Sequence, residues 1–313
     1  MPDIIDQNLV DFIRCEWDRT VPTKVEAAAR DIVERYGNSV SGVIFYGSCL
    51  RTGEIEDKIL DFYVIVDDYC KAYSSRALAI ANKVLPPNVF YHEVTIDGTV
   101  VRSKYAVLSE ADLAYRTSRQ CLNVSVWARF CQPCMLLVPR DKIACTVING
   151  YIAQACVTML ANLRELFPQM IASRDLWVEA FEQTYAAELR SERGGKGLEI
   201  YVLDQERYDR LTPIVLAALG VMAQSKPLQN QPARWTSVRP KLKWMMRRWN
   251  GKLVSFLRLL KATTTFDGGI DYIAWKIKRH SGVEIEIKDW MRKHPIVAGV
   301  SLFWGARKKG AFK

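Results

Sequence analysis

The chain has 313 residues, of which 49% are hydrophobic and 25% are charged, a globular composition that excludes disordered and fibrous classes. The net charge is +10, and residues 201–313 hold 22 Lys and Arg against only 8 Asp and Glu. This asymmetry favours an anionic partner for the second half, either nucleic acid or an anionic membrane surface; a basic face that only maintains solubility is the alternative.

The first part of the chain alternates between helical and strand patterns. Helical signals occur at residues 6–36, at 71–84 and from Ser109 with Asp112 onward. Apolar runs typical of strands occur at residues 39–48, 58–68, 88–96 and 103–109. Pro86-Pro87 stops the second helix. The alternation predicts an α/β domain over residues 1–140.

The second part of the chain is mostly helical in pattern. The helical pattern runs from about residue 146 to 225 and is interrupted at Arg190–Gly197, where glycines and charges gather. A stretch rich in Pro, Gln and Asn follows at 225–240 and indicates a linker or an exposed loop. We therefore expect a helical domain over residues 141–239 and a separate basic region over residues 240–313.

The basic region begins with an amphipathic pattern at residues 241–262. Seven apolar residues share one side at helical spacing: Trp244, Met245, Trp249, Leu253, Phe256, Leu257 and Leu260. Lys and Arg residues surround them, as in a helix that lies in a membrane interface. The alternative is a basic surface helix whose aromatic face packs on its own core. The tail at residues 294–313 repeats the pattern, so we favour membrane contact through Trp244, Arg247, Arg248, Trp249 and Phe256.

The cysteines and the hydrophobic runs indicate where the protein works. Eight cysteines are scattered up to Cys156, and the lone pair Cys131 and Cys134 offers too few ligands for structural zinc. We expect reduced, mostly buried thiols. No apolar run approaches the roughly 18–20 residues of a transmembrane helix, and the acidic N-terminus resembles neither a signal nor a transit peptide. Any membrane contact is therefore expected to be peripheral.

The segment from Val43 to Asp68 contains the candidate site residues. A strand ends at Gly47-Ser48, and the next strand contains Asp61 among apolar residues, where a carboxylate needs compensation. Glycine lets the backbone approach a phosphate, and the turn with the Ser48 hydroxyl forms a cradle for phosphate oxygens. A carboxylate on the neighbouring strand holds Mg²⁺ against the same phosphates. This arrangement predicts a nucleotidyltransferase-like α/β domain; a buried, hydrogen-bonded structural Asp61 is the alternative.

A second acid is missing from the usual position. Alternate strand residues face the same way, yet Tyr63 stands two residues after Asp61, and Asp67 is roughly 20 Å farther along an extended strand. Glu93 on the third predicted strand is our candidate to complete the metal site. The alternative for Glu93 is an exposed acid on an edge strand.

These residues resemble a known family. The segments FYGSCLR, ILDFYVIVDD, LPPNVFYHE and SKYAVLS are similar to those of the mitochondrial-type phosphatidate cytidylyltransferases, the soluble CDP-diacylglycerol synthases related to the mitochondrial translocator assembly and maintenance protein. WARFCQP resembles a later motif and places Arg129 on its arginine, while Gln132 replaces its lysine. QTYAAELRSERGGKG resembles another motif and contains Tyr185, Glu188, Arg190, Glu192 and Lys196. Cys49 departs from the family by replacing a glycine.

The resemblance implies a reaction and its site. CTP and phosphatidate would give CDP-diacylglycerol and pyrophosphate, with Mg²⁺ as cofactor, in a nucleotidyltransferase domain followed by a helical or winged-helix domain. Asp61 and Glu93 would be catalytic and hold the metal, and the lipid headgroup would be contacted by Glu188, Arg190 and Lys196. The nucleotide-binding residues would be Tyr46, Gly47, Ser48, Lys104 and Arg129.

Two other functions compete with this one. A nucleotidyltransferase could act on RNA or a small molecule, although no RNA-binding motif is visible and nucleic acid is not the partner we expect. A membrane-associated scaffold with a degenerate site would explain the missing second acid. The absence of a mitochondrial presequence points to a bacterial relative that works in the cytoplasm, peripherally on the inner face of the cytoplasmic membrane. The sequence leaves the oligomeric state open.

Overall fold

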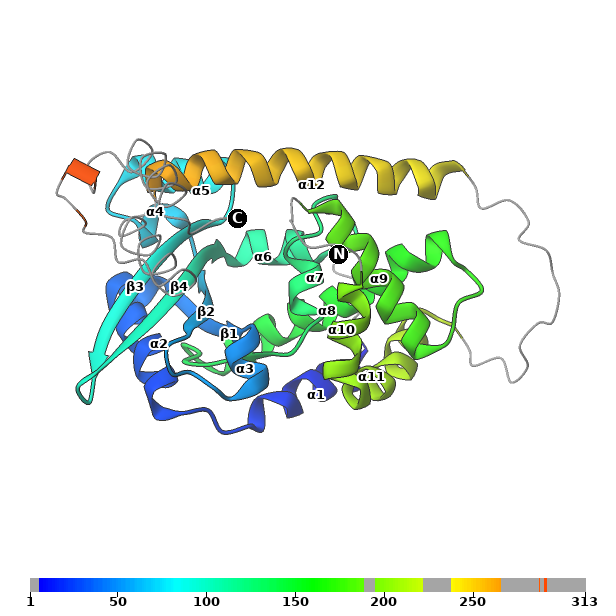
Figure 1. Cartoon of the computed structure of the whole chain (residues 1–313), viewed down its shortest axis with the longest axis horizontal. Coiled ribbons are helices and arrows are strands. Elements are labelled where there is room, and N and C mark those ends of the chain that lie inside the picture. Colours follow the sequence, from blue (N-terminus) through cyan, green and yellow to red (C-terminus); the bar gives the residue numbers. More distant parts are fainter. Residues whose placement is uncertain (1–5, 189–194, 222–237, 266–286, 288–289, 292–313) are drawn as a thin grey trace, which may run out of the picture. The chain divides into compact units, whose positions relative to one another are not determined.

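The computed structural model describes residues 6–188, 195–221, 238–265, 287 and 290–291 (Figure 1). The chain forms two compact units, each built from two separate stretches of sequence. Of the described residues, the sheet unit comprises 21–108, 257–265, 287 and 290–291, and the helical unit comprises 6–20, 109–188, 195–221 and 238–256. This division differs from the boundaries expected near residues 140 and 239. The tail at 294–313 and Arg190 lie outside the described residues.

The sheet unit has four strands in the order β3-β4-β2-β1. Their bounds are β1 Val40–Tyr46, β2 Ile59–Val66, β3 Asn88–Ile96 and β4 Thr99–Ser109. β1 pairs with β2, and β3 pairs with β4, both antiparallel. All four predicted strands are confirmed, and β4 is longer than expected. Every residue of β1 is buried, which explains its unbroken apolar run.

Helices complete the sheet unit: α2 Thr23–Tyr36, α3 Ser48–Thr52, α4 Tyr69–Ala72 and α5 Arg76–Val84. The single helix expected over residues 6–36 is divided, because α1 (Gln7–Cys15) ends early and α2 begins after Pro22, whose ring cannot occupy a helix interior. The helix expected over 71–84 is divided as well. Its second half, α5, starts where the Ser75 hydroxyl accepts a hydrogen bond from the Leu78 amide.

The helical unit contains most of the remaining elements. Their bounds are α1 Gln7–Cys15, α6 Glu110–Thr117, α7 Trp127–Phe130, β5 Cys134–Leu136, α8 Lys142–Leu166, α9 Ser173–Ala187, α10 Lys196–Leu203 and α11 Gln205–Ala218. Short 3₁₀ turns occupy Glu16–Asp18 and Gly37–Ser39, the latter in the sheet unit. Helix α12, Val238–Thr265, belongs to the helical unit up to Phe256 and to the sheet unit beyond it.

Helix α8 provides much of the core of the helical unit. By length and composition alone it is apolar enough to cross a membrane, with a mean hydropathy of 1.5 over 18 residues, a run that we did not identify in the sequence. In this structure 61% of that window is buried. Ile148, Ile152 and Leu160 are fully buried. Burial on this scale is also what the central helix of a compact unit requires.

A charged pair is buried in the same unit. The Arg207 Nη2 donates to Glu16 Oε2 at 3.0 Å, and its Nη1 donates to the carbonyl of Cys131 at 2.8 Å. The side chains of Arg207 and Glu16 are 6% and 10% exposed. All eight thiols are free and five are buried, which confirms the expectation for the cysteines.

Candidate functional site

The turn at Gly47 lies directly against Asp61. In the register of β1 and β2, Asp61 is opposite Tyr46, the residue before the turn. Gly47 has a φ of +93°, and a Cβ atom at this position would lie 2.9 Å from Asp61 Oδ2. Only glycine therefore fits here, both because of its backbone angle and because the carboxylate occupies the space. The structure thus brings together the two groups that the sequence predicted to be neighbours.

The carboxylate of Asp61 has an ammonium partner. Lys104 Nζ, on the adjacent strand β4, lies 3.1 Å from Asp61 Oδ1. The two side chains are 37% and 25% exposed, so solvent and small ions reach both groups. The sequence argument assigned the compensation of this carboxylate to a metal ion. In the structure, the negative charge of Asp61 is compensated by Lys104, which was expected to contact phosphate.

Two tyrosines lie beside the Asp61 carboxylate. Tyr46 and Tyr63 are buried, and their ring centroids are 5.3 Å apart. The strand position at which a second acid was expected is therefore occupied by the packed ring of Tyr63. Tyr46 is the residue before the turn, and its role in nucleotide binding stays a prediction.

Ser48 begins α3, and Cys49 follows it into the interior. Cys49 is 3% exposed, and its thiol donates to the carbonyl of Ile59 at 3.4 Å. Burial, together with the nearby Asp61 carboxylate, raises the pKa of the Cys49 thiol, so it is neutral near pH 7. Cys49 is therefore a packing residue beneath the turn and not a nucleophile.

Glu93 has partners of its own on β3 and β4. Its Oε1 accepts a hydrogen bond from Arg102 Nε at 3.0 Å and another from the Tyr91 hydroxyl. Strand β4 separates β3 from β2, which carries Asp61. Among the residues that the structure describes, no three His, Cys, Asp or Glu side chains form a group able to hold a metal ion. The role of Glu93 as a second metal ligand stays a prediction.

The donor set around Asp61 decides what kind of cation it suits. Mg²⁺ is commonly bound by one or two carboxylates that share it with substrate phosphates and water. One carboxylate with a lysine ammonium on one oxygen does not form a resident site within the described part of the chain. It does fit a cation that arrives with a nucleotide, since phosphate oxygens then supply the remaining ligands.

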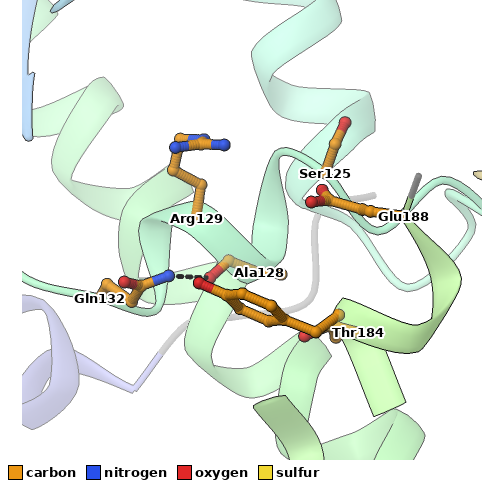
Figure 2. Close-up of a pocket in the computed structure, with 7 residues that line it drawn as sticks. Ser125, Ala128, Arg129, Gln132, Thr184 and Glu188 are labelled. Atoms are coloured by element: carbon orange, nitrogen blue, oxygen red, sulfur yellow. Dashed lines mark hydrogen bonds between the residues drawn. The ribbon is translucent and has the colours of Figure 1, made fainter. Parts of the chain in front are cut away.

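The helical unit contains a separate pocket (Figure 2). It is partly open to solvent, and its polar lining includes one arginine and one glutamate. Figure 2 shows Arg129, Ser125 and Glu188 toward one side of it, and Gln132, whose Nε2 donates to the Ala128 carbonyl at 3.5 Å, on another. The lining residues are Ser125, Ala128, Arg129, Gln132, Thr184, Tyr185 and Glu188.

This pocket gathers residues from two distant motifs. Arg129 and Gln132 come from the first, and Tyr185 and Glu188 come from the second. The resemblance had pointed to these four positions without indicating that they share one pocket. Ser125 and Thr184 were missed, because a lone hydroxyl residue in a loop or a helix carries no sequence signal of its own.

Lys196 lies at the start of α10 and is not among the residues that line this pocket. Its ammonium pairs with Glu199 of the same helix. The first amides of α10 are held by Glu182, whose Oε1 accepts from the amides of Gly195 at 2.9 Å and Gly197 at 2.8 Å. This helix start is therefore already occupied by a carboxylate.

Helix α12 has a different orientation from the one expected. Trp244 and Arg247, which we predicted to face a membrane, are 2% and 0% exposed and belong to the core of the helical unit. The expectation of membrane contact is therefore wrong for Trp244 and Arg247. It assumed that all basic residues of an amphipathic pattern face water. Trp249 and Phe256 are 74% and 50% exposed, and Arg248 is also exposed.

Comparison with known proteins adds little to this geometry. No protein-family model and no curated protein matches the chain. Among solved structures, the chain is similar to a nucleotidyltransferase-like protein from Exiguobacterium sibiricum, at 12% identity over 77% of this chain and 80% of that one, with a TM-score of 0.26. A superposition of this quality supports no conclusion about fold or activity.

Proposed function

We propose that the chain is a nucleotidyltransferase whose nucleotide phosphates bind at the Gly47 turn. The observation that carries this proposal is the contact between Gly47 and Asp61, with Lys104 Nζ 3.1 Å from the same carboxylate. A backbone turn without a Cβ atom, a carboxylate and an ammonium in one exposed place are the groups that a triphosphate needs. Ser48 follows Gly47 directly and adds a hydroxyl.

The metal ion in this proposal is Mg²⁺ brought in by the nucleotide. Asp61 would hold the ion, and the ion would neutralise negative charge on the phosphates. Lys104, which pairs with Asp61 in this structure, would then be available to pair with phosphate oxygens. Asp61 and Lys104 would thus bind and orient the phosphates beside the Gly47 turn.

The finer proposal names the substrates as CTP and phosphatidate, and it rests on the sequence resemblance. An oxygen of the phosphatidate phosphate forms a bond to the α-phosphorus of CTP, and the bond from that phosphorus to the bridging oxygen breaks, releasing pyrophosphate. The attacking oxygen is already anionic, so no strong general base is needed and positioning dominates. Arg129, in its pocket with Glu188, is proposed to bind one phosphate group.

The membrane part of the proposal rests on the outer face of α12. Helix α12 contains eight Lys and Arg residues and no Asp or Glu. Large apolar side chains along it are about half exposed or more: Leu242, Met245, Met246, Trp249, Leu253 and Phe256. Apolar side chains among basic ones favour the interface of an anionic bilayer, where phosphatidate resides.

A scaffold without catalytic activity is the second candidate. The ion pair of Asp61 and Lys104 favours it, because a carboxylate that is permanently neutralised by an ammonium has no need of a metal ion. The two candidates differ in whether CTP binding depends on Mg²⁺ and on Asp61.

The decisive experiment follows labelled CTP into lipid. The whole chain is incubated with Mg²⁺ and vesicles of phosphatidate and phosphatidylcholine, and the lipid fraction is extracted. We expect label in CDP-diacylglycerol with the wild type and none with Asp61→Asn. Glu26→Gln, which alters an exposed acid whose ion-pair distance to Arg30 is 3.9 Å, is the control and should retain activity.

Each outcome separates the candidates. Label that appears only with RNA or a small acceptor would keep the nucleotidyltransferase and reject the lipid. No transfer to any acceptor, with CTP affinity indifferent to Mg²⁺ and to Asp61→Asn, would establish the scaffold.

A further inference from the structure

Helix α12 packs against both segments that form the pocket of the helical unit. The first segment is the loop before α7 together with α7, which contribute Ser125, Ala128, Arg129 and Gln132. The second segment is the C-terminal end of α9 and the residue after it, which contribute Thr184, Tyr185 and Glu188. The inner face of α12 contacts each segment through different residues.

Arg247 holds the first segment. Its Nη1 donates to the carbonyls of Cys121 at 3.0 Å and Leu122 at 3.1 Å, a few residues before Ser125. Its guanidinium carbon lies 5.7 Å from the ring centroid of Trp127, the first residue of α7. Its Nη2 donates to Asn162 Oδ1 of α8 at 2.7 Å, so the same side chain ties this segment to the core helix.

Gly251 holds the second segment. A Cβ atom at this position would lie 2.1 Å from the carbonyl oxygen of Ala187, the last residue of α9. The backbones of α12 and α9 are therefore in direct contact where α9 ends, one residue before Glu188. One turn earlier, Arg248 Nη2 donates to Gln183 Oε1 at 2.6 Å.

The chemistry of Arg247 indicates what this contact contributes. Its side chain is fully buried, and the hydrogen bonds described above go to neutral oxygens. Burying a charge is costly, and an apolar side chain of similar size would pack here at a lower electrostatic cost. What a guanidinium adds is a rigid fork of directed hydrogen bonds. Such a fork fixes where the loop before α7 lies relative to α8.

We propose that α12 is the positioning element of the Arg129 pocket, with Arg247 and Gly251 as its positioning residues. Arg247 sets the position of the segment with Ser125 and Arg129, and Gly251 sets the position of the segment with Tyr185 and Glu188. The inference rests on the proposed phosphate-binding role of this pocket. In this proposal the inner face of α12 positions the pocket, whereas its exposed face is proposed to contact the membrane.

The experiment measures the affinity of inorganic pyrophosphate for the whole chain by titration calorimetry, well below the unfolding temperature. Arg247→Lys keeps the charge and loses the fork, and Gly251→Ala adds one methyl group at the contact with Ala187. We expect each to weaken binding about tenfold while the protein stays folded by circular dichroism. If the Arg247→Lys variant does not fold, the pyrophosphate affinity of the Gly251→Ala variant decides the test.

Three controls distinguish positioning from stability. Leu211→Ala opens a cavity at a fully buried position of α11, so it should lower the melting temperature and leave the pyrophosphate affinity unchanged. Lys252→Ala alters an exposed neighbour of Gly251 and should change neither quantity. Arg129→Ala tests the pocket itself and should weaken binding.

The outcomes separate the two proposals. If Arg129→Ala weakens binding but Arg247→Lys and Gly251→Ala bind pyrophosphate like the wild type, the positioning inference is overturned and the pocket stands. If Arg129→Ala leaves the pyrophosphate affinity unchanged, both the phosphate-binding role of the pocket and the positioning inference are rejected. The test of CTP transfer at Asp61 is unaffected.

Discussion

Asp61 Oδ1 lies 3.1 Å from Lys104 Nζ, so a carboxylate within one strand is neutralised by an ammonium on the next. A partly exposed pair of this kind contributes about 1 kcal/mol or less to folding. Stability alone therefore accounts poorly for this pair, and the proposed phosphate site would give it a role.

Lys104→Met tests this view. We expect the affinity for CTP in Mg²⁺ to fall about tenfold, because the ammonium no longer contacts phosphate, whereas the free energy of unfolding changes by less than about 1 kcal/mol. Equilibrium dialysis and urea unfolding measure the two effects. Lys58→Met, which removes the ion pair with Glu54 in the same unit, is the control for a lost lysine. An unchanged CTP affinity would remove Lys104 from the site.

Gly47→Ala should abolish CTP binding and also destabilise the sheet unit by about 1–3 kcal/mol. The residue would have to adopt a φ of +93° and would place its Cβ atom 2.9 Å from Asp61 Oδ2. Gly37→Ala is a matched control, because Gly37 also has a positive φ of +54° but no heavy atom within 4 Å of the added Cβ atom. Both variants should be less stable in urea, and only Gly47→Ala should lose CTP. Loss of CTP in both would indicate a general effect of stability.

The burial of His92 predicts that the stability of the protein depends on pH. Its side chain is 1% exposed, and its Nε2 lies 2.8 Å from Asp31 Oδ2. Burial, followed by the nearby Arg35 charge, lowers the pKa of His92 in the folded state, although Asp31 and Glu93 oppose the shift. The unfolded chain, with a pKa of about 6.5, therefore takes up a proton first as the pH falls.

The stability that this histidine contributes is thus present above about pH 6.5 and is lost below it. We expect the free energy of unfolding to decrease between about pH 7.5 and pH 5.5, and His92→Phe to reduce that slope. Urea denaturation at each pH measures it. A slope equal to that of the wild type in His92→Phe would assign the pH dependence to other groups.

Glu16→Gln should cost about 3–5 kcal/mol of folding free energy, because it leaves the Arg207 guanidinium buried without its counter-charge. Thermal unfolding of the helical unit measures the loss. Asp18→Asn, two residues away, removes an exposed partner whose carboxylate lies 3.8 Å from Arg14, and it should change stability by about 0.5 kcal/mol or less. Equal effects of the two substitutions would show that burial of the Arg207 pair is unimportant.

Substitution of Trp249 and Phe256 by Ser should reduce flotation with anionic vesicles without lowering the melting temperature, because both side chains are exposed. Ile143→Ser removes an apolar side chain that is 76% exposed on α8 and is the control. Equal flotation by the wild type and the double variant would reject membrane contact through α12. Deleting residues 241–313 would be a poor substitute, since it also removes the buried Trp244 and Arg247.

The strands could be predicted because their signals are local. β3 occupies the expected residues 88–96, and the N-cap at Ser109, whose hydroxyl accepts from the Asp112 amide, starts α6 as expected. The neighbourhood of Gly47 and Asp61 was predictable for the same reason, since a turn and two adjacent strands define it.

The inner face of α12 could not be predicted from the sequence. A pattern of Lys, Arg and Trp at helical spacing identifies an amphipathic helix but does not say which basic residue is buried. Arg247 is buried because carbonyls of Cys121 and Leu122, more than a hundred residues earlier, accept its hydrogen bonds. Likewise, Arg129 and Glu188 line one pocket only because two distant helices meet.

The helical unit combines residues 6–20 with the described residues between 109 and 256, and this has a consequence for biosynthesis. The four strands of the sheet unit leave the ribosome as one continuous stretch, so their pairing can begin early. The helical unit must wait, because Arg247 is translated more than a hundred residues after Cys121 and Leu122, whose carbonyls accept its hydrogen bonds. Until then the faces of α7, α8 and α9 that α12 covers remain bare, and a nascent chain stalled before residue 238 should be a preferred client of chaperones.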